Sequence, residues 1–296
     1  MTMSAPVAVI VLNWNRPELT DRALEALRRL TPPAPRVLVV DNGSTDDSVA
    51  RVSRLHPEVE ILPLGENRGF AAGMNAGIRH VRSDGLRYVW LLNNDTEVES
   101  SALTEMLAVA DSDGRIGAVG SVLSPLGASS EQPVFGGRVR WWLGLSGHVR
   151  VPPSIEEPEY LVGASLLVRC DAIDEIGGLD EAFFLYWEDT DYCLRLKRAG
   201  WRLAVAERAI VHHRVSATLA RGHAWEVYLT YSAVRFFRKH APVPIVPVVC
   251  GAALRAGRGL ALGRPRLAGR IVRAAWSAWA GRPLARVASS DEPTLT

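Results

Sequence analysis

The first 123 residues alternate between unbroken apolar runs and segments whose apolar residues repeat at helical spacing. Strands that are buried on both faces show such unbroken runs, as in parallel sheets. The runs predict strands at residues 7–12, 37–40, 59–62, 88–92 and 116–123. The segments with helical spacing lie at residues 17–30, 44–55, 70–81 and 100–110. This order predicts a doubly wound, mostly parallel α/β sheet flanked by helices.

Two helices carry local boundary signals. Ser44 is a favourable N-cap for the helix at 44–55, and Asp47 completes a capping box. Gly200 is predicted to be the C′ residue that ends a helix at 189–199.

The pattern changes after residue 123. Residues 124–158 are rich in Gly, Pro and Ser, with scattered aromatics such as Phe135, Trp141 and Trp142. They are predicted to form a long functional loop region, because compact domains rarely keep long irregular stretches without a use. Strands are expected at 160–169 and 203–206, and the remaining residues are mostly helical and basic.

Composition places the chain among ordinary globular enzymes. It has 296 residues, of which 48% are hydrophobic and 22% are charged. The three cysteines are widely spaced and form no CxxC pair, so they are expected to be reduced thiols in a cytosolic protein. The N-terminal residues do not resemble a signal peptide, and no apolar stretch reaches the roughly 20 residues of a spanning helix.

The net charge of +2 is unevenly distributed. Residues 227–290 contain 11 Lys and Arg and no Asp or Glu. Read as a helix, residues 266–279 place three arginines on one face and apolar side chains on the other. Such a helix is typical of a protein that lies at an anionic membrane surface, although it could instead dock on the protein core. No nucleic-acid-binding motif is present. The tail helix is divided as follows: Arg266, Arg270 and Arg273 on the basic face, and Leu267, Ile271, Val272, Ala275 and Trp279 on the apolar face.

Polar residues follow three of the predicted strands. Asn13 ends the first, Asp41 the second, and Asn93, Asn94 and Asp95 the fourth. One such end would be ordinary turn chemistry, but three predict a polar ligand at one sheet edge. The sequence has neither a GxGxxG turn after the first strand nor a GxxxxGK[ST] loop, which argues against a dinucleotide or a P-loop triphosphate. Asp95 could hold a divalent cation together with substrate phosphates, so a nucleoside-diphosphate site is predicted.

Five motifs in this order resemble the family 2 glycosyltransferases, and within them the rhamnosyltransferase-like branch. They are "VIVLNWNRPELT", "VLVVDNGSTDDSV", "ENRGFAAGMNAGI", "YVWLLNNDTEV" and "FFLYWEDTDYCLRLKRAGW". The resemblance covers roughly residues 5–240 and implies the GT-A fold. It divides the chain into a nucleotide-sugar-binding half at 1–123, an acceptor-binding and catalytic half at 124–226, and a basic helical region at 227–296.

The resemblance assigns donor-binding roles. Asp95 matches the position that binds the metal bridging the donor diphosphate, with Asn93 and Asn94 beside it; many family members carry Asp where this chain has Asn93. Asp41 matches the residue that reads a uracil or thymine base, and Asn13 lies beside that base. The motif that closes over the nucleoside matches Asn67, Arg68, Gly69, Gly73 and Asn75. Tight packing is an alternative reason for the glycines, as is turn chemistry for Asp41.

The catalytic base implied by the resemblance is Asp189. Glu188 or Asp191 could instead orient the acceptor, and all three acids could simply favour the start of a helix. His213 matches a histidine that helps to ligate the metal or the diphosphate. Two further residues are expected on the acceptor side, Gly163 and Trp187.

Together these features predict an inverting, metal-assisted glycosyltransferase. The resemblance favours dTDP-rhamnose or a UDP-sugar as donor, Mn²⁺ or Mg²⁺ as cofactor, and a glycan or lipid-linked acceptor in cell-surface polysaccharide synthesis. The protein is expected to be cytoplasmic and peripheral at the inner face of the cell membrane. Two alternatives remain: a nucleotidyltransferase-type α/β enzyme, and a non-catalytic protein that binds nucleotide sugars at a membrane surface.

Overall fold

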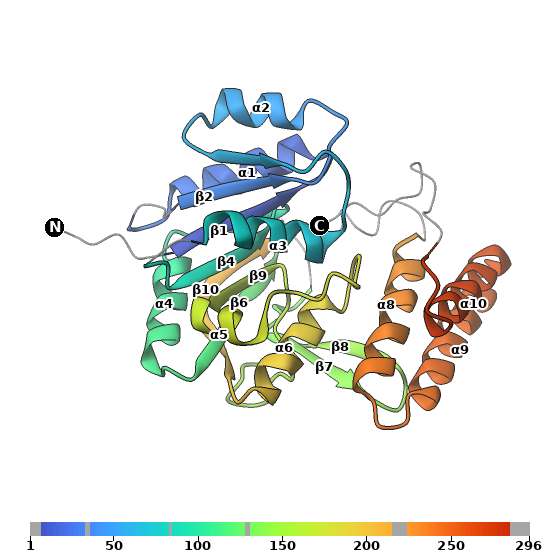
Figure 1. Cartoon of the computed structure of the whole chain (residues 1–296). Coiled ribbons are helices and arrows are strands. Elements are labelled where there is room, and N and C mark those ends of the chain that lie inside the picture. Colours follow the sequence, from blue (N-terminus) through green and yellow to red (C-terminus); the bar gives the residue numbers. More distant parts are fainter. Residues whose placement is uncertain (1–6, 33–35, 83–84, 128–130, 215–223, 285–296) are drawn as a thin grey trace.

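A central sheet of eight strands organises the molecule (Figure 1). The structure is a computed structural model, and it describes residues 7–32, 36–82, 85–127, 131–214 and 224–284. The strand order is β3-β2-β1-β4-β9-β6-β10-β5, in which β9 and β5 run antiparallel to their neighbours. The strands are β1 Val7–Asn13, β2 Arg36–Asp41, β3 Glu60–Pro63, β4 Tyr88–Asn93, β5 Thr96–Val98, β6 Ile116–Pro125, β9 Ser165–Arg169 and β10 Arg202–His213.

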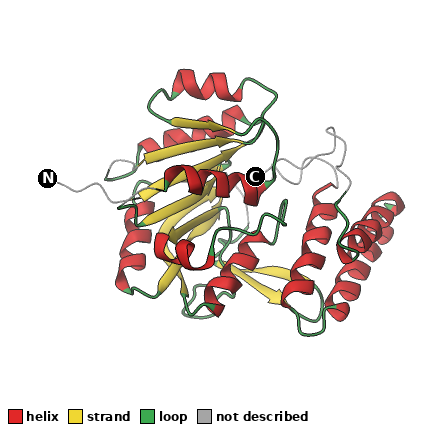
Figure 2. Ribbon diagram, viewed as in Figure 1, coloured by secondary structure: helices red, strands yellow, loops and turns green. Residues whose placement is uncertain are grey.

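Helices cover both faces of this sheet (Figure 2). The buried strand residues divide into two apolar clusters, one on each face. On one face pack α1 Pro17–Arg28, α2 Ser48–Leu55 and α4 Ala102–Ser112. On the other face pack α3 Phe70–Val81, α5 Cys170–Ile176 and α6 Glu188–Arg198. The predicted doubly wound, mostly parallel α/β class is therefore confirmed.

A helical bundle and a hairpin stand beside the sheet domain. The bundle consists of α8 Ala224–His240, α9 Ile245–Ala261 and α10 Pro265–Trp279, which pack on one another. The hairpin is formed by β7 Gly136–Arg140 and β8 Leu145–Val149, and it reaches from the sheet domain toward the bundle (Figure 1).

Several local predictions were wrong. Residues 124–158 are not one irregular loop, because they contain the β7–β8 hairpin. The strand expected at 160–169 begins only at Ser165, and β10 is much longer than residues 203–206. Helix α2 begins at Ser48, not Ser44, because the Ser44 hydroxyl donates to Asp41 instead of capping a helix.

The tail helix was predicted correctly in position but not in environment. In α10 the side chains of Leu267, Ile271 and Ala275 are buried in the bundle. Val272, expected on the same apolar face, is 55% exposed. Most of the side of α10 that was expected to be apolar, at Leu267, Ile271 and Ala275, is therefore covered by protein and does not contact a membrane.

Candidate active site

The three polar strand ends lie side by side, as the sequence predicted. β1 lies between β2 and β4, and all three run parallel. The register pairs Asn13 with Asp41, and Leu12 with Asn93. The polar residues that follow β1, β2 and β4 therefore share one edge of the sheet, at the carboxyl ends of the strands, where ligands bind in open α/β folds.

A buried hydrogen-bond network joins the ends of β1 and β2. The Asn13 amide donates to Asp41 Oδ1 at 2.9 Å and accepts from the Thr20 hydroxyl at 2.8 Å. The backbone N–H of Ser44 donates to Asp41 Oδ2 at 3.0 Å. The side chains of Asn13 and Asp41 are 1% and 3% exposed. This network fixes the Asp41 carboxylate before any ligand arrives, and the remaining lone pairs of its oxygens can still accept a base N–H.

The 67–69 loop is held by Asn42, a residue that the sequence did not single out. The Asn42 amide donates to Asn67 Oδ1 and to the Gly69 carbonyl, both at 3.2 Å, and it accepts from the Arg68 N–H at 3.0 Å. Gly69 has φ of +87°, and a Cβ there would lie 2.5 Å from the Phe184 carbonyl oxygen. The loop therefore needs glycine at this position. Its position beside Asp41 is compatible with the predicted contact with the nucleoside.

Two other residues of that motif make contacts within the protein. A Cβ on Gly73 would lie 2.6 Å from a methyl carbon of Leu12, so helix–sheet packing excludes a larger residue. The Asn75 amide donates to the Leu179 carbonyl at 2.8 Å and accepts from the Leu179 N–H at 2.9 Å. These contacts tie α3 to the loop before α6, and a direct contact of either residue with nucleotide stays a prediction.

Asp95 and His213 meet where β5 pairs with β10. Asp95 precedes β5, and its neighbour Thr96 pairs with His213. The distance from His213 Nε2 to Asp95 Oδ1 is 3.3 Å. Burial alone would lower the pKa of His213, but the Asp95 carboxylate raises it above its ordinary value.

Several buried polar atoms around Asp95 have no hydrogen-bond partner among the described residues. They include both Asp95 carboxylate oxygens, His213 Nε2 and the side-chain oxygens of Asn93 and Asn94. Unpaired buried oxygens are uncommon in native proteins and call for a ligand or ion. The Asn94 amide nitrogen, in contrast, donates to Thr20 Oγ1 at 3.1 Å and so joins the β1–β2 network.

A cavity of about 420 Å³ opens beside this cluster. It is lined by Asn93, Gly163, Asp189 and His213, and by residues of β8 and of the loop before α6. Asp189 Oδ2 accepts from the Gly163 N–H at 2.9 Å, and Asp189 Oδ1 from the Thr190 N–H at 2.6 Å. A Cβ on Gly163 would lie 3.2 Å from the Asp189 Cβ, so glycine gives this carboxylate room. Burial raises the pKa of Asp189, although these hydrogen bonds oppose the rise.

Glu188 and Trp187 line the same cavity, and each has an unpaired polar atom. Glu188 Oε2 and Trp187 Nε1 are buried without a hydrogen-bond partner in the described chain. Burial raises the pKa of Glu188 well above its ordinary value, and the Asp189 carboxylate adds to the rise. The Trp187 ring packs on Phe236 with centroids 4.7 Å apart, and Trp187 is only 3% exposed. Stacking of a sugar on the Trp187 face is therefore blocked, but its N–H lies at the cavity wall.

Asp191, predicted as a possible acceptor residue, does not line the cavity. It is fully buried between α6 and α8. Its carboxylate is within 2.7 Å of Arg195 Nε, Lys239 Nζ and His240 Nε2. Burial alone would raise the pKa of Asp191, but these neighbours lower it to about 2. Asp191 therefore anchors α6 to α8 of the bundle.

His240 extends this anchor. Arg198 Nη1 lies 2.8 Å from His240 Nδ1. Because a guanidinium can only donate, Nδ1 is the acceptor and Nε2 carries the proton given to Asp191. The sequence analysis did not identify His240, and its position in a basic helical segment offered no signal.

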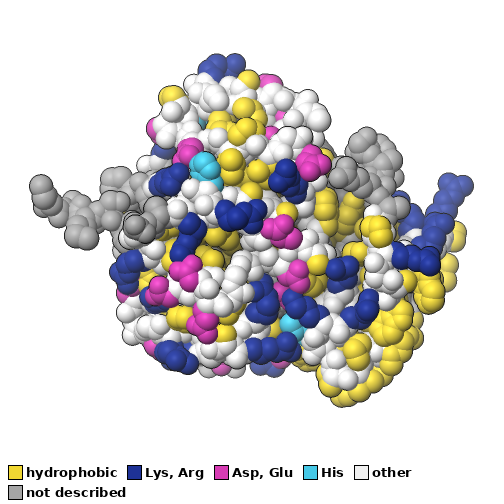
Figure 3. Space-filling model, in the orientation of Figure 1, with side chains coloured by type: hydrophobic (Ala, Val, Ile, Leu, Met, Phe, Trp, Pro, Cys, Tyr) yellow, Lys and Arg dark blue, Asp and Glu magenta, His cyan; other side chains and the backbone are white. Residues whose placement is uncertain are grey.

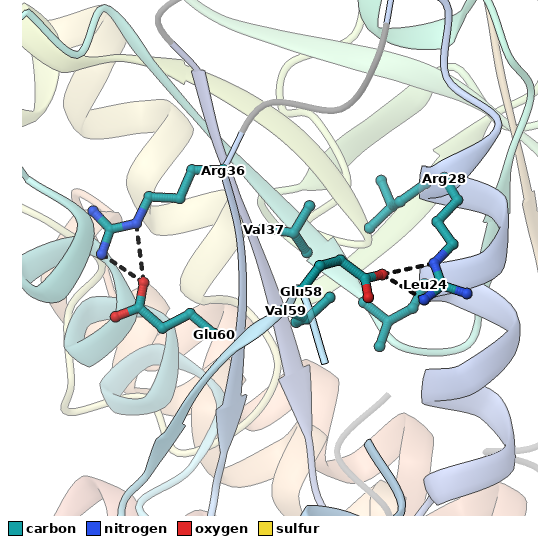
Figure 4. A pocket seen from close by; sticks show the side chains of 8 residues that line it. Leu24, Arg28, Arg36, Val37, Glu58, Val59 and Glu60 are labelled. Atoms are coloured by element: carbon teal, nitrogen blue, oxygen red, sulfur yellow. Dashed lines mark hydrogen bonds and ion pairs between the residues drawn. The ribbon is translucent and has the colours of Figure 1, made fainter. Parts of the chain in front are cut away.

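A second hollow of about 380 Å³ lies away from this chemistry (Figure 4). It is located at the amino ends of β2 and β3, the opposite edge of the sheet. Its charged side chains are paired with one another, Arg28 with Glu58 and Arg36 with Glu60. It offers no unpaired polar group, and we assign it no function.

Other cavity residues also escaped the sequence analysis. Ser146 and His148 come from β8, inside the stretch that was expected to be loop, and Tyr186 precedes α6. Burial raises the pKa of Tyr186, with the Glu188 and Asp95 carboxylates adding to the rise. Tyr186 and Trp187 are set apart by their positive φ values of 68° and 70°, which the sequence does not indicate.

Comparison with known proteins identifies relatives of this chain. The sequence profile of glycosyl transferase family 2 matches residues 8–175, more than half of the chain. An N-acetylglucosaminyl-diphospho-decaprenol L-rhamnosyltransferase of Mycobacterium tuberculosis is 29% identical over 241 residues, which cover 73% of this chain and 78% of that protein.

Two solved structures share the fold. A mannosyltransferase from Pyrobaculum calidifontis, in complex with GDP-Man and Mn²⁺, aligns with a TM-score of 0.58 and 21% identity, over 96% of this chain and 77% of its own. GalNAc-T7, solved with UDP, GalNAc and Mn²⁺, aligns with a TM-score of 0.66 and 13% identity, over 94% of this chain and 58% of its own. At these identities the likeness concerns the fold, and it confirms the predicted GT-A architecture.

Proposed function

The chain belongs to glycosyltransferase family 2 and transfers a sugar from a nucleotide sugar, and from this premise we propose an inverting, metal-assisted transfer in which Asp189 is the catalytic base. The observation that supports it best is the cavity in which the buried Asp189 carboxylate lies near Asn93 and His213. One wall of this cavity offers a base, and the other a site for a diphosphate and its cation.

The donor is proposed to enter along the edge formed by β1, β2 and β4. Asp41 is held rigidly by Asn13 and Ser44, as a base-reading carboxylate requires. A fixed acceptor can discriminate an imide N–H, so a uracil or thymine nucleotide is favoured. The rhamnosyltransferase relative supports dTDP-rhamnose as the first donor to test, followed by UDP-sugars.

The residues around Asp95 fit a divalent cation. Asp95 supplies two buried carboxylate oxygens, and His213 an imidazole nitrogen that lies 3.3 Å from one of them. Apart from this ion pair, these atoms have no partner among the described residues. No cluster of three His, Cys, Asp or Glu occurs within the described ranges, which is compatible with a cation held by two side chains and the substrate phosphates. The imidazole favours Mn²⁺ over Mg²⁺. A bound cation would stabilise negative charge on the leaving diphosphate.

Asp189 is positioned for a single displacement. Its carboxylate accepts the acceptor hydroxyl proton as the hydroxyl oxygen attacks the anomeric carbon. The bond from that carbon to the diphosphate oxygen breaks, and the nucleoside diphosphate leaves with the electron pair. The hydrogen bonds from Gly163 and Thr190 orient the carboxylate, while burial, which raises its pKa, improves it as a base.

The acceptor is proposed to bind in the cavity next to Asp189. The Trp187 N–H and Glu188 Oε2 can each pair with a sugar hydroxyl, since neither atom has a hydrogen-bond partner in the described chain. A glycan or lipid-linked acceptor of cell-surface polysaccharide synthesis suits such a polar cavity. A lipid-linked acceptor would bring the enzyme to the inner face of the cell membrane.

Calorimetry tests the donor assignment directly. We expect UDP or dTDP to bind in the presence of Mn²⁺ and to bind much more weakly without it, and GDP and NAD to bind poorly. Transfer from dTDP-rhamnose and from UDP-sugars is then compared. Metal-independent binding, or binding of NAD alone, would contradict the proposal.

A further inference from the structure

Most of the exposed large apolar side chains gather on one side of the molecule. Eleven of the fourteen among the described residues lie on α9, α10, the turns that flank α9 and the tip of the β7–β8 hairpin. Figure 3 shows apolar side chains concentrated at the lower right, where Figure 1 places α9. We call these eleven side chains the apolar face: Trp142, Leu143, Val243, Ile245, Val246, Val249, Leu254, Leu260, Leu262, Val272 and Trp276.

Helix α9 is apolar on both of its sides. Val248 and Ala256 are buried in the core that α9 shares with α8 and α10, and Gly251 packs against Gly144 of the hairpin. The outer side still presents Val249 at 56% and Leu254 at 49% exposure. A surface helix in water normally turns polar residues outward. A contiguous apolar patch of this kind marks a site of interaction with a protein or a membrane.

The apolar face is bordered by positive charge only. The described part of the bundle from Val227 to Leu284 contains ten Lys and Arg and no acidic residue. Arg258 of α9 and Arg266 and Arg273 of α10 are exposed and form no ion pair with a described residue. On α10 they alternate with Val272 and Trp276, which are 55% and 63% exposed. Arginine beside exposed aliphatic and Trp side chains is the composition of helices that lie in the headgroup region of anionic lipids.

The hairpin connects this face to the catalytic cavity. Its tip carries Trp142, 67% exposed, and it is pinned to α9 by a hydrogen bond of 3.1 Å from Arg255 to the Gly144 carbonyl. The strand that follows, β8, supplies Ser146 and His148 to the cavity wall. At about 3.3 Å per residue, the tip and the cavity wall are on the order of 10–20 Å apart. The hairpin tip and α9 are therefore in direct contact, and the strand that follows the tip lines the cavity.

We propose that the apolar face and its bordering arginines form an interface with an anionic lipid bilayer, and that this interface sets the catalytic cavity next to the lipid headgroups. The observation that selects a bilayer over a protein partner is that α9 and α10 carry no acidic residue, next to an apolar surface that water would not favour. The one acid of the described bundle, Glu226, is buried in the first turn of α8. No described helix is long and apolar enough to cross the bilayer. This deepens the proposed function, because it gives a lipid-linked acceptor a direct route to Asp189.

Vesicle sedimentation with the full chain tests the interface. The probes are vesicles of equal parts phosphatidylglycerol and phosphatidylcholine, and vesicles of phosphatidylcholine alone. We expect the wild type to bind the anionic vesicles and to bind more weakly at high salt. The triple variant R258Q/R266Q/R273Q should bind them on the order of 100-fold more weakly, since each basic residue near an anionic surface contributes about fivefold.

The apolar part has its own matched control. The double variant V249D/L254D should lose binding at least tenfold, whereas I155D, at an equally exposed apolar residue outside the apolar face, should bind like the wild type. These positions are exposed, so folding should be retained, as circular dichroism will check. Wild-type protein that stays in the supernatant, or a V249D/L254D variant that binds normally, would overturn the interface.

A second copy of the chain is the competing occupant. Analytical ultracentrifugation that found a dimer, converted to monomer by V249D/L254D, would also overturn the bilayer assignment. Sedimentation requires no donor or acceptor. Vesicle binding without sugar transfer would therefore support the interface and refute the proposed function. Sugar transfer to a soluble acceptor without vesicle binding would support the proposed function and refute the interface.

Discussion

Two neighbouring regions differ in how their buried polar groups are bonded: the edge of β1, β2 and β4 where we propose that the donor binds, here called the donor edge, and the cavity at Asp189 where we propose that transfer occurs. At the donor edge, Asn13, Asp41 and Asn42 have their polar groups joined in one hydrogen-bond network. In the cavity, Glu188 Oε2 and Trp187 Nε1 have no hydrogen-bond partner in the described chain, and the Asp95 carboxylate beside it has only its ion pair with His213. The first region is rigid before ligand binds, and the second has groups that only ligands can satisfy.

This difference separates recognition from chemistry. A satisfied network costs nothing further on binding and can discriminate a nucleobase by position alone. Unpaired buried groups destabilise the free protein, but they can interact most strongly with charge that develops during reaction. The comparison predicts that substitutions at the donor edge weaken binding, whereas substitutions in the cavity alter rate or raise stability.

The largest effect is expected at Asp189. The variant Asp189→Asn should lower kcat by 10²–10⁴-fold, since the amide cannot take the acceptor proton. Calorimetric binding of the donor nucleotide should change little, because the amide keeps the shape of the side chain. The matched variant Asp171→Asn, at an exposed acid in the first turn of α5, should behave like the wild type. Transfer that survives in Asp189→Asn would place the base elsewhere.

The pH profile sharpens the same point. Transfer requires the Asp189 carboxylate to be ionised, and burial raises the pKa of Asp189. The rate should therefore fall on the acid side at a higher pH than an ordinary aspartate would give. A profile of kcat/KM against pH measures this limb, and a limb at or below the ordinary aspartate range would argue against Asp189 as base.

The next effect concerns stability at Asp191. Removing this buried acid in Asp191→Ala leaves Arg195 and Lys239 without their buried partner and should lower the free energy of unfolding by about 3–5 kcal/mol. The exposed pair of Asp174 with Arg82 is the control, and Asp174→Ala should lower it by less than about 1 kcal/mol. Urea unfolding curves give both values, and equal effects would show that Asp191 is not an anchor.

The contrast between Asp189 and Asp191 also shows which parts of the fold and the site the sequence could predict. Apolar runs that end in polar residues predicted the shared sheet edge, because buried strands leave an unambiguous pattern. Asp189 was predicted as the base and Asp191 as a residue that could orient the acceptor. Positions two apart on a helix differ by about 200°, so Asp189 faces the cavity and Asp191 faces α8. The hairpin was missed because its strands, GGRVR and LSGHV, are rich in glycine. Long-range partners such as His240 leave no local signal.

A moderate effect is expected at the donor edge. Asp41→Asn should weaken binding of the nucleotide by about 10- to 100-fold, the range for losing a hydrogen bond to a charged group, while kcat at saturating donor should change little. The control Asp47→Asn, at an exposed acid a few residues on, should bind normally. Calorimetry and transfer kinetics separate the two quantities. If Asp41→Asn lowered kcat but left the affinity for the nucleotide unchanged, the donor edge would contribute to the reaction and not only to nucleotide binding.

The smallest effect is a gain in stability at Glu188. Burial and the Asp189 carboxylate raise the pKa of Glu188 in the folded state, so folding favours its protonated form. This contribution to stability is fully present below the unfolded pKa, about 4.3, and is lost as pH rises toward the folded pKa. Glu188→Gln cannot ionise, so it should match the wild type near pH 4 and exceed its free energy of unfolding by about 1 kcal/mol at pH 7. Glu207→Gln, at an exposed position of β10, should show no such pH-dependent gain. Urea unfolding at both pH values measures this difference in the free energy of unfolding. A Glu188→Gln variant less stable than the wild type at pH 7 would mean that an ion pair stabilises the Glu188 carboxylate, and that the buried polar groups of the cavity have partners like those of the donor edge.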